Sequence, residues 1–325
     1  MSKQRKTKPG ALPICKTANK VLWQLLSAKI HSVTVAEKVL REGGEDGLHQ
    51  FRVALRRLRT LLRAYRPQFD PGMKIRGQLS TLASSTNQAR DLEVLVGWIE
   101  SEQVDSGISA EILATVVVNL RTLDASDPVA GVDGTAISKC WASTSKKLSK
   151  RILKAPRDAS VRFNLVTSDL IKRQSDELLH YLRLIQTAED VAENHKARIA
   201  AKRLRYILEP LRGAVEQVTP LLPLLTCLQD ELGVLNDRAV FVERLEQYYR
   251  GLSTLKLARS MTQDRDPTAG DFQVDYIAGA VLQLTDRAGV ERRVLFDQFH
   301  ADWDSRLVNL AKQISRVAIA LINDD

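Results

Sequence analysis

His49-Gln-Phe-Arg-Val-Ala-Leu-Arg-Arg-Leu-Arg-Thr60 returns later in the chain as His195-Lys-Ala-Arg-Ile-Ala-Ala-Lys-Arg-Leu-Arg-Tyr206. The two segments share a histidine, an alanine, a leucine and three arginines at matching places, and lysine replaces arginine at a fourth basic place. They are separated by 195 − 49 = 146 residues, and Arg90-Asp91 matches Asn236-Asp237 at the same offset. An internal duplication explains these gapless matches better than chance does.

The composition indicates a globular protein rich in helices. Of the 325 residues, 44% are hydrophobic, 27% are charged and 5% are aromatic, and such a mixture is typical of neither disordered nor membrane proteins. No apolar run approaches the roughly 20 residues of a membrane span, so we expect no membrane association. The three cysteines form no short-spaced pair, which suits a reducing cytoplasm. We expect a cytoplasmic protein, with residues 1–13 as a flexible basic tail.

Apolar residues recur at helical spacing between clusters of glycine and proline, which predicts helices throughout the chain. The expected helices cover about 14–42, 48–66, 73–87, 90–102, 107–124, 135–155, 161–187, 190–212, 219–234, 236–250, 272–288 and 290–322. We therefore expect an all-α fold of two pseudo-symmetric helical bundles, because short connections place successive helices antiparallel. The first bundle should cover residues 14–156 and the second 157–325.

The repeated segments each predict a helix with one basic face. A residue advances by about 100° along a helix, so residues spaced by three and four lie in one stripe. The basic stripe of the first copy contains His49, Arg52, Arg56, Arg59 and Arg63, and that of the second contains His195, Arg198, Lys202 and Arg205. A neighbouring apolar stripe should face the core; its members are Phe51, Leu55, Leu58, Leu62 and Tyr65, with Ala197, Ala201, Leu204, Leu208 and Leu211.

The basic stripes predict an anion-binding surface. An isolated arginine-rich helix is most often solvated or paired with acids of neighbouring helices, but here the same cation spacing occurs twice. The net charge of +9 also favours a polyanion, whether nucleic acid, acidic lipid or a phosphate polymer. Arginine can hold a phosphate with two parallel hydrogen bonds, and histidine becomes a stronger donor as it protonates near neutral pH.

Some basic residues are expected to lie outside the stripes. Arg57 and Arg203 point about 130° away, and we expect structural ion pairs Arg57–Asp91 and Arg203–Asp237, with each aspartate at a helix N-terminus. Lys147 and Arg293 match at the common offset and are expected to widen the basic surface. Their neighbours on the first of these helices are expected to be solvated; they are Lys150, Arg151 and Lys154.

No cofactor, metal or catalytic residue is expected. Arginines around His49 and His195 disfavour a cation. The sequence contains no Gly-rich phosphate loop ending in Gly-Lys-Ser or Gly-Lys-Thr, and no cluster of carboxylates suited to the magnesium of phosphoryl transfer. A binding protein is therefore favoured over an enzyme.

The chain resembles the CHAD family, the conserved histidine α-helical domain, in four segments. They are the two histidine helices, Ala89-Arg-Asp-Leu-Glu-Val94 and Leu228-Gln-Asp-Glu-Leu-Gly-Val-Leu-Asn-Asp237. The resemblance covers about residues 14–322, and no Glu-x-Glu-x-Lys motif of a fused CYTH triphosphatase domain occurs. It implies two four-helix bundles that bind inorganic polyphosphate in a basic groove or pore through the residues of the two basic stripes. Glu209 replaces the arginine that Arg63 supplies in the first copy, so the second copy should bind less strongly at that end.

The expected function is non-catalytic binding of polyphosphate, in targeting to polyphosphate granules or in scaffolding there. A nonspecific nucleic-acid binder is an alternative, although single-strand binders usually interleave aromatic side chains with cations and these stripes have none. A polyphosphatase or triphosphatase is a further alternative. Protein partners, oligomeric state and preferred chain length are not predicted.

Overall fold

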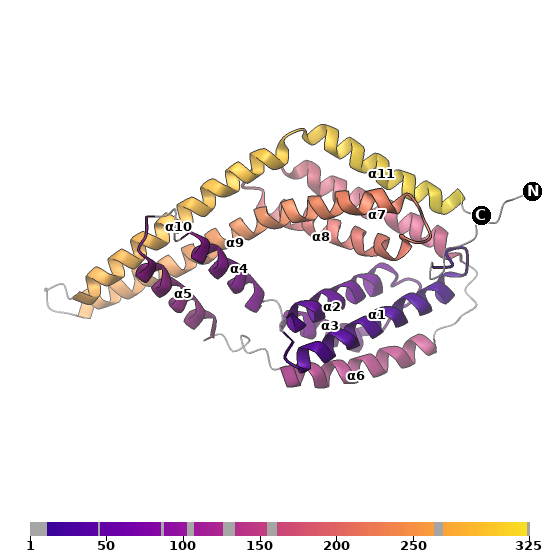
Figure 1. The fold of residues 1–325 in the computed structure, drawn as a ribbon, viewed down its shortest axis with the longest axis horizontal. Coiled ribbons are helices and arrows are strands. Elements are labelled where there is room, and N and C mark those ends of the chain that lie inside the picture. The colour runs from indigo at the N-terminus through magenta and orange to yellow at the C-terminus, as the bar shows by residue number, and fades with distance from the viewer. Residues whose placement is uncertain are drawn as a thin grey trace, which may run out of the picture.

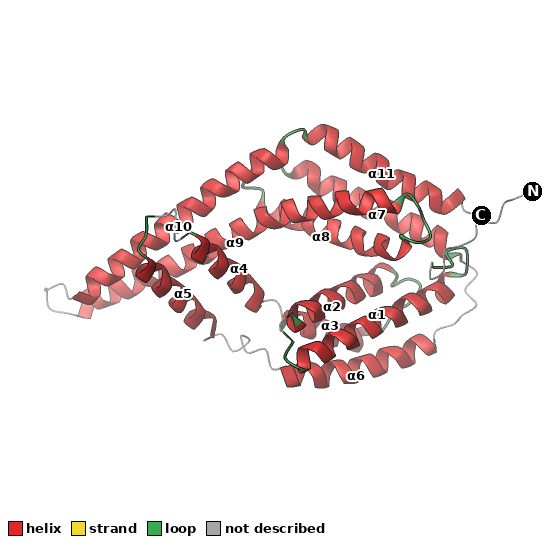
Figure 2. Cartoon of the chain, viewed as in Figure 1, coloured by secondary structure: helices red, strands yellow, loops and turns green. Residues whose placement is uncertain are grey.

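The protein is built from helices. The computed structural model describes residues 12–44, 46–85, 88–102, 107–125, 134–154, 161–262 and 269–323. Within these ranges every regular element is helical, and the extended backbone contributes one isolated bridge between Thr17 and Arg162 (Figure 2). The expected all-α class is confirmed. The tail expected over residues 1–13 lies, except for its last two residues, outside the described part of the chain.

The first bundle contains four helices of the N-terminal half (Figure 1). They are α1 (Ala18–Arg41), α2 (Gly47–Ala64), α3 (Met73–Ser84) and α6 (Gly134–Leu153). Helix α1 packs against α2 and α6, and α3 packs against α2 and α6. The apolar stripe expected on α2 is buried along its whole length, from Phe51 to Tyr65, so the predicted helical phase is confirmed.

The second bundle lies beside the first and shares its hydrophobic core. It contains α7 (Phe163–Leu184), α8 (Val191–Leu208), the first part of α9 (Val218–Thr262) and α11 (Trp303–Asn323). The 3₁₀ turn η1 (Glu209–Leu211) follows α8. The ring of Tyr65 stacks on that of Phe163 with centroids 5.5 Å apart, and the Tyr65 hydroxyl lies 3.0 Å from Thr167 Oγ1. These contacts join the end of α2 to the start of α7.

The remaining helices form an arm that projects from the two bundles (Figure 1). Helices α4 (Gln88–Ser101) and α5 (Ala110–Ala125) pack there against the second part of α9 and against α10 (Ala269–His300). The arm has its own core. Helices from the N-terminal half therefore pack on helices from the C-terminal half. The domain boundary expected at residue 156 stays a prediction, because residues 155–160 lie outside the described ranges.

Two expected helix breaks are wrong. Helix α9 runs without interruption through residues 235–236, where a break was expected because Asp237 resembled a cap. Asn236 and Asp237 instead contact side chains of α8, so their polar groups serve tertiary contacts rather than a helix end. The break expected at residues 288–290 lies near residue 301, where Asp302 has a φ of 55° and separates α10 from α11.

Part of α9 is long and apolar enough to cross a membrane by length and composition, over Val218–Ala258. In this structure its leucines Leu221, Leu225 and Leu232 are fully buried in the shared core. Such burial is ordinary for the core helix of a bundle.

Candidate functional site

The two predicted basic helices lie against each other. Helix α2 contacts α8 directly, although the two belong to different halves of the sequence. On α8 the apolar stripe that contains Ala197, Ala201 and Leu204 is fully buried, as predicted. The basic residues beside the two apolar stripes are thereby brought to one line of contact, which we call the α2–α8 seam. It is defined by Arg56 and Arg57 of α2 and Lys202, Arg205 and Tyr206 of α8.

The Tyr206 side chain lies at the centre of the seam. Its hydroxyl accepts a hydrogen bond of 2.9 Å from Arg56 Nε. The guanidinium carbons of Arg56, Arg57 and Arg205 lie 5.9, 5.6 and 5.1 Å from the centre of its ring. A ring face attracts cations within about 6 Å, so one aromatic side chain holds arginines of both helices together. Tyr206 itself is only 1% exposed and offers no surface on which a base could stack.

Lys202 shows how dense the positive charge of the seam is. Its pKa is lowered from 10.5 to about 7, first by burial and then by repulsion from Arg198 and Arg56. Asp237 opposes this shift and Arg205 adds to it. The repelling arginines come from both helices, so the charge of each basic stripe acts on the other. An external anion placed here would favour the charged amine.

We expect Lys202→Met to stabilise the free protein. Because its folded pKa is about 7 and its ordinary value is 10.5, the unfolded chain binds more protons between these values. Stability therefore rises with pH through that window. Methionine keeps the apolar stem without the charge, so thermal or urea unfolding at pH 7 should show a gain of about 1–2 kcal/mol, allowing for partial solvent screening.

The advantage of Lys202→Met should shrink as the pH approaches 10.5, where the unfolded lysine also becomes neutral. The matched control is Lys196→Met on the same helix, because the Lys196 side chain is half exposed and should change stability by no more than about 0.5 kcal/mol. A destabilised Lys202→Met protein at pH 7 would contradict the charge assignment.

Two arginines of α8 have buried donors with no partner. The Nε atoms of Arg198 and Arg205 are inaccessible to solvent and, among the described residues, have no hydrogen-bond acceptor. Arg198 Nη2 lies 3.9 Å from an Asp237 carboxylate oxygen. Buried donors are nearly always satisfied in folded proteins. The basic stripe of α8 therefore carries more hydrogen-bond donors than the described residues satisfy.

The two histidines lie near the start of the two helices. His195 Nδ1 lies 3.1 Å from Asn236 Oδ1 on α9, a contact that orients the imidazole ring. His49 is exposed on the first turn of α2, and Arg52 is half-buried one turn later. The histidine at each helix start lies N-terminal to the cations of the seam.

The C-terminal end of the basic stripe of α2, at Arg59 and Arg63, lies near Arg203 of α8. Burial and the neighbouring Arg63 lower the pKa of Arg59. Burial and Arg63 likewise lower the pKa of Arg203, whereas Glu177 and Tyr181 oppose that shift. Arg63 thus lies close enough to Arg203 for the two charges to interact, and cations of both helices meet here as well.

The expected partner of Arg203 is wrong, whereas the expected pair of Arg57 with Asp91 stays a prediction. Arg57 pairs with Glu209, with Nε 3.1 Å from Oε2, and Arg203 pairs with Glu177 at 3.0 Å. Asp237 lies instead beside Arg198, and the side chain of Asp91 is outside the described residues. The reason is that α2 packs against α8, so Arg57 meets the end of α8 and belongs to the seam.

Glu209 faces more than one cation. It pairs with Arg57, and its Oε1 lies 3.8 Å from Arg205 Nη1. Lys29 of α1 is close enough that Glu209 raises its pKa, although burial and Arg57 together lower it. Lys29, Arg57 and Tyr206 were not predicted as site residues. The sequence carries no motif for them, because their position depends on how separate helices pack.

Lys147 and Arg293 are not brought to the seam. Lys147 lies on α6, which packs against α1 and α3, whereas Arg293 lies on α10, which packs against α9 and α5. By its packing, α6 corresponds to α11, since α6 lies against α1 as α11 lies against α7. The common offset of 146 residues places α6 opposite α10 rather than α11. In this part of the chain it therefore does not relate helices with the same packing.

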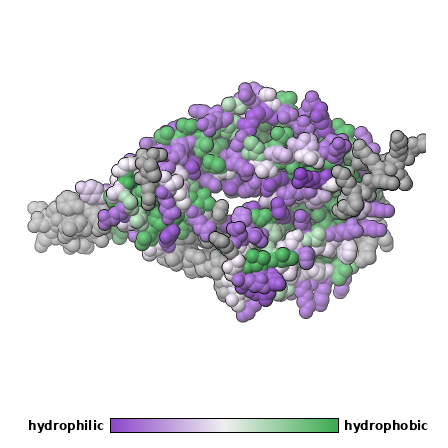
Figure 3. All heavy atoms as spheres, in the orientation of Figure 1, coloured by the Kyte–Doolittle hydropathy of each residue, from purple (hydrophilic) through white to green (hydrophobic). Residues whose placement is uncertain are grey.

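The surface around the bundles is hollowed. Figure 3 shows an opening between the lower and upper parts of the molecule, with hydrophilic residues along much of its border. Within the described residues, no three histidine, cysteine, aspartate or glutamate side chains gather as they would around a metal ion. The chemistry that this site offers is the binding of anions by guanidinium and ammonium groups.

The chain was compared with known families and structures. The sequence model of the CHAD domain family matches residues 24–246. The crystal structure of the CHAD domain from the plant Ricinus communis is similar with a TM-score of 0.67 and 21% identity, over 92% of this chain and 96% of that one. PptA from Streptomyces chartreusis is similar with a TM-score of 0.52 and 14% identity, over 87% and 99% of the two chains. No curated protein matches.

Proposed function

Because the chain belongs to the CHAD domain family, we propose that it binds inorganic polyphosphate along the α2–α8 seam and the basic stripes beside it. The family resemblance implies this ligand class. The contacts would come from His49, Arg52, Arg56, Arg59 and Arg63 of α2 and from His195, Arg198, Lys202 and Arg205 of α8. Arg57, whose guanidinium group lies beside the Tyr206 ring, joins them.

The observation that carries the proposal is the gathering of arginines from two helices around Tyr206, with a pKa of Lys202 lowered to about 7 beside them. Such a cluster destabilises the free protein, and an anion that spans both helices would relieve the repulsion. A phosphate chain supplies several negative charges in succession. Arg52 and Arg63 are roughly 16 Å apart along α2 at 1.5 Å per residue, so one extended chain can meet several cations.

We propose a binding role without catalysis, in targeting to polyphosphate bodies or in scaffolding there. The seam offers donors and positive charge but, in the described part of the chain, no cluster of metal-binding side chains beside them. Phosphoryl transfer usually needs magnesium held by carboxylates. Incubation with polyphosphate and magnesium should therefore release no free phosphate. Release that is lost in seam variants would revive an enzymatic role.

Competition between polyanions tests the ligand class. We expect long-chain polyphosphate to bind with an affinity that falls steeply with salt, by analogy with a log–log slope of about −0.7 per contact on single strands. Single-stranded DNA or RNA at equal phosphate concentration should displace little of it, because the buried Tyr206 ring cannot stack on bases. Equal displacement by nucleic acid would support a nonspecific nucleic-acid binder instead.

A further inference from the structure

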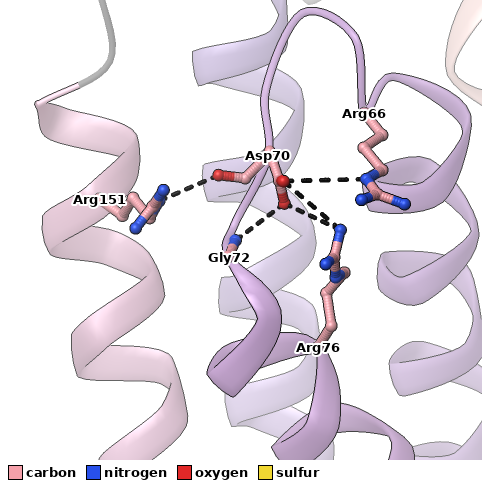
Figure 4. A network of polar contacts seen from close by, with 5 residues as sticks. All are labelled: Arg66, Asp70, Gly72, Arg76 and Arg151. Atoms are coloured by element: carbon pink, nitrogen blue, oxygen red, sulfur yellow. Dashed lines mark hydrogen bonds and ion pairs between the residues drawn. The ribbon is translucent and has the colours of Figure 1, made fainter.

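A second group of cations lies beyond the C-terminal end of α2, around the loop that leads to α3 (Figure 4). Three arginines meet there at Asp70. Arg76 Nη1 lies 3.2 Å from Asp70 Oδ1, Arg66 Nε lies 3.8 Å from Oδ2, and Arg151 Nε donates a bond of 2.9 Å to the Asp70 carbonyl. The arginines come from the end of α2, from α3 and from α6. We call these four residues the Asp70 cluster.

The Asp70 cluster carries an excess of positive charge. The Gly72 backbone N–H, which donates to Asp70 Oδ1, and the neighbouring arginines lower the pKa of Asp70, so that this carboxylate is ionised at neutral pH. One negative charge thus faces three guanidinium groups. Each guanidinium has five N–H donors, and the contacts with Asp70 use only a few of them. The remaining donors are available to an acceptor from solution.

The backbone holds the cluster in place. Gly72 has a φ of 88°, which side-chain-bearing residues rarely adopt. A Cβ atom at this position would lie 3.2 Å from Arg151 Nη1. The loop after α2 therefore approaches α6 closely, and Arg151 ties the two together through the Asp70 carbonyl. Arg151, which was expected to be merely solvated, has a defined orientation.

The Asp70 cluster continues the basic stripe of α2. Arg66 follows Arg63 by three residues in the turn after α2, where its backbone N–H bonds to the Arg63 carbonyl at 3.4 Å. Arg63 is roughly 10 Å from Arg56 at 1.5 Å per residue of α2, and Arg66 lies just beyond the helix end. Lys147 precedes Arg151 by four residues on α6 and lies on the same face of that helix. This places Lys147 beside the Asp70 cluster rather than at the seam.

We propose that the Asp70 cluster is a second contact site for the same polyphosphate chain, occupied only by chains long enough to extend from the α2–α8 seam. The inference rests on the proposed function and adds a determinant of chain length to it. The seam alone holds a short polyphosphate. A longer chain also meets the outward donors of Arg66, Arg76 and Arg151, and each added charge-assisted contact strengthens binding.

The test compares the double variant Arg66→Gln/Arg76→Gln with the wild type, using tripolyphosphate and a long-chain polyphosphate as ligands. Long-chain affinity should fall about tenfold, and the log–log salt slope should become shallower by about 1.4 for two lost contacts. Tripolyphosphate affinity should not change. Unchanged long-chain affinity, or an equal loss for both ligands, would overturn the second site.

Two further variants complete the test. Arg151→Gln removes one contact from α6 and leaves both ion pairs of Asp70, so it should weaken long-chain binding about threefold and make the salt slope shallower by about 0.7, even if the double variant folds poorly. The matched control is Arg250→Gln in the arm, where an exposed arginine pairs with Glu246; it should bind both ligands as the wild type does. Wild-type protein that binds neither ligand would refute the proposed function itself, whereas variants that bind both normally refute only the second site.

Discussion

Reversing the charges of Arg56 and Lys202 together, as Arg56→Glu/Lys202→Glu, is expected to abolish measurable polyphosphate binding. The two residues belong to different helices and repel each other across the seam. Hydrogen bonds to charged groups contribute about 1.5–3 kcal/mol each, so their loss alone weakens binding roughly 10²–10⁴-fold. The introduced carboxylates add repulsion. Titration with long-chain polyphosphate at low salt measures the effect.

The matched control for this double reversal is Lys172→Glu/Arg173→Glu on α7. It changes the net charge equally, both side chains are exposed, and Arg173 contacts Asp169, one turn earlier on the same helix. Its affinity should fall only slightly. Arg56 also bonds to Tyr206, so circular dichroism and thermal unfolding must show that the first variant is folded. Near-wild-type binding by a folded Arg56→Glu/Lys202→Glu protein would exclude the seam.

Polyphosphate should bind more tightly at pH 6 than at pH 8. The free-protein pKa of Lys202 is about 7, and a bound polyanion raises it, so binding takes up a proton. With the amine charged in the complex, linkage predicts about a tenfold loss of affinity between pH 6 and pH 8. Calorimetry in buffers of different ionisation enthalpy also counts the protons taken up.

Two variants separate the lysine from the histidines in this pH dependence. Lys202→Met should bind more weakly and lose most of the dependence, whereas His49→Gln/His195→Gln should keep the part that comes from Lys202. Lys202→Met is also the variant expected to unfold at a higher temperature without ligand, so weaker binding would not reflect a damaged fold. A flat wild-type profile from pH 6 to pH 8 would contradict the proposed role of the lysine.

The basic and apolar stripes could be predicted because they depend only on helical spacing. Phe51, Leu55 and Leu58 are buried as their phase requires, and so are Ala201 and Leu204 in the second copy. The direct contact of α2 with α8 was implied only by the repeat and the family resemblance. Periodicity within a helix says which face is buried but not which helix covers it.

The ion pairs could not be predicted for the same reason. Arg203 was expected to meet Asp237 but pairs with Glu177 of α7, and Arg57 contacts Glu209, far along the chain. The hydrogen bond of Arg56 to Tyr206 likewise joins residues 150 positions apart. Pairing of charges depends on the packing of helices from both halves, and many acidic residues of similar local context compete for each arginine.

The arm departs from the simple duplicated plan because corresponding segments have different lengths. Helices α3 and α4 are separate, whereas the matching residues of the second half form the single helix α9. The residues at the common offset from α6 lie on α10, which has different neighbours from α6, so Lys147 and Arg293 do not lie on equivalent helices. Local sequence similarity at these two positions was too weak to show the added length.

The most direct test of polyphosphate binding at the α2–α8 seam is chemical modification of Lys202 in the wild-type protein, followed by mass spectrometry. Its lowered pKa leaves much of the amine neutral and reactive near pH 7.5. Long-chain polyphosphate should strongly suppress its acylation and leave Lys196 of the same helix unchanged, whereas DNA at equal phosphate concentration should protect little. Acylation of Lys202 at the same rate with saturating polyphosphate as without it would contradict the account.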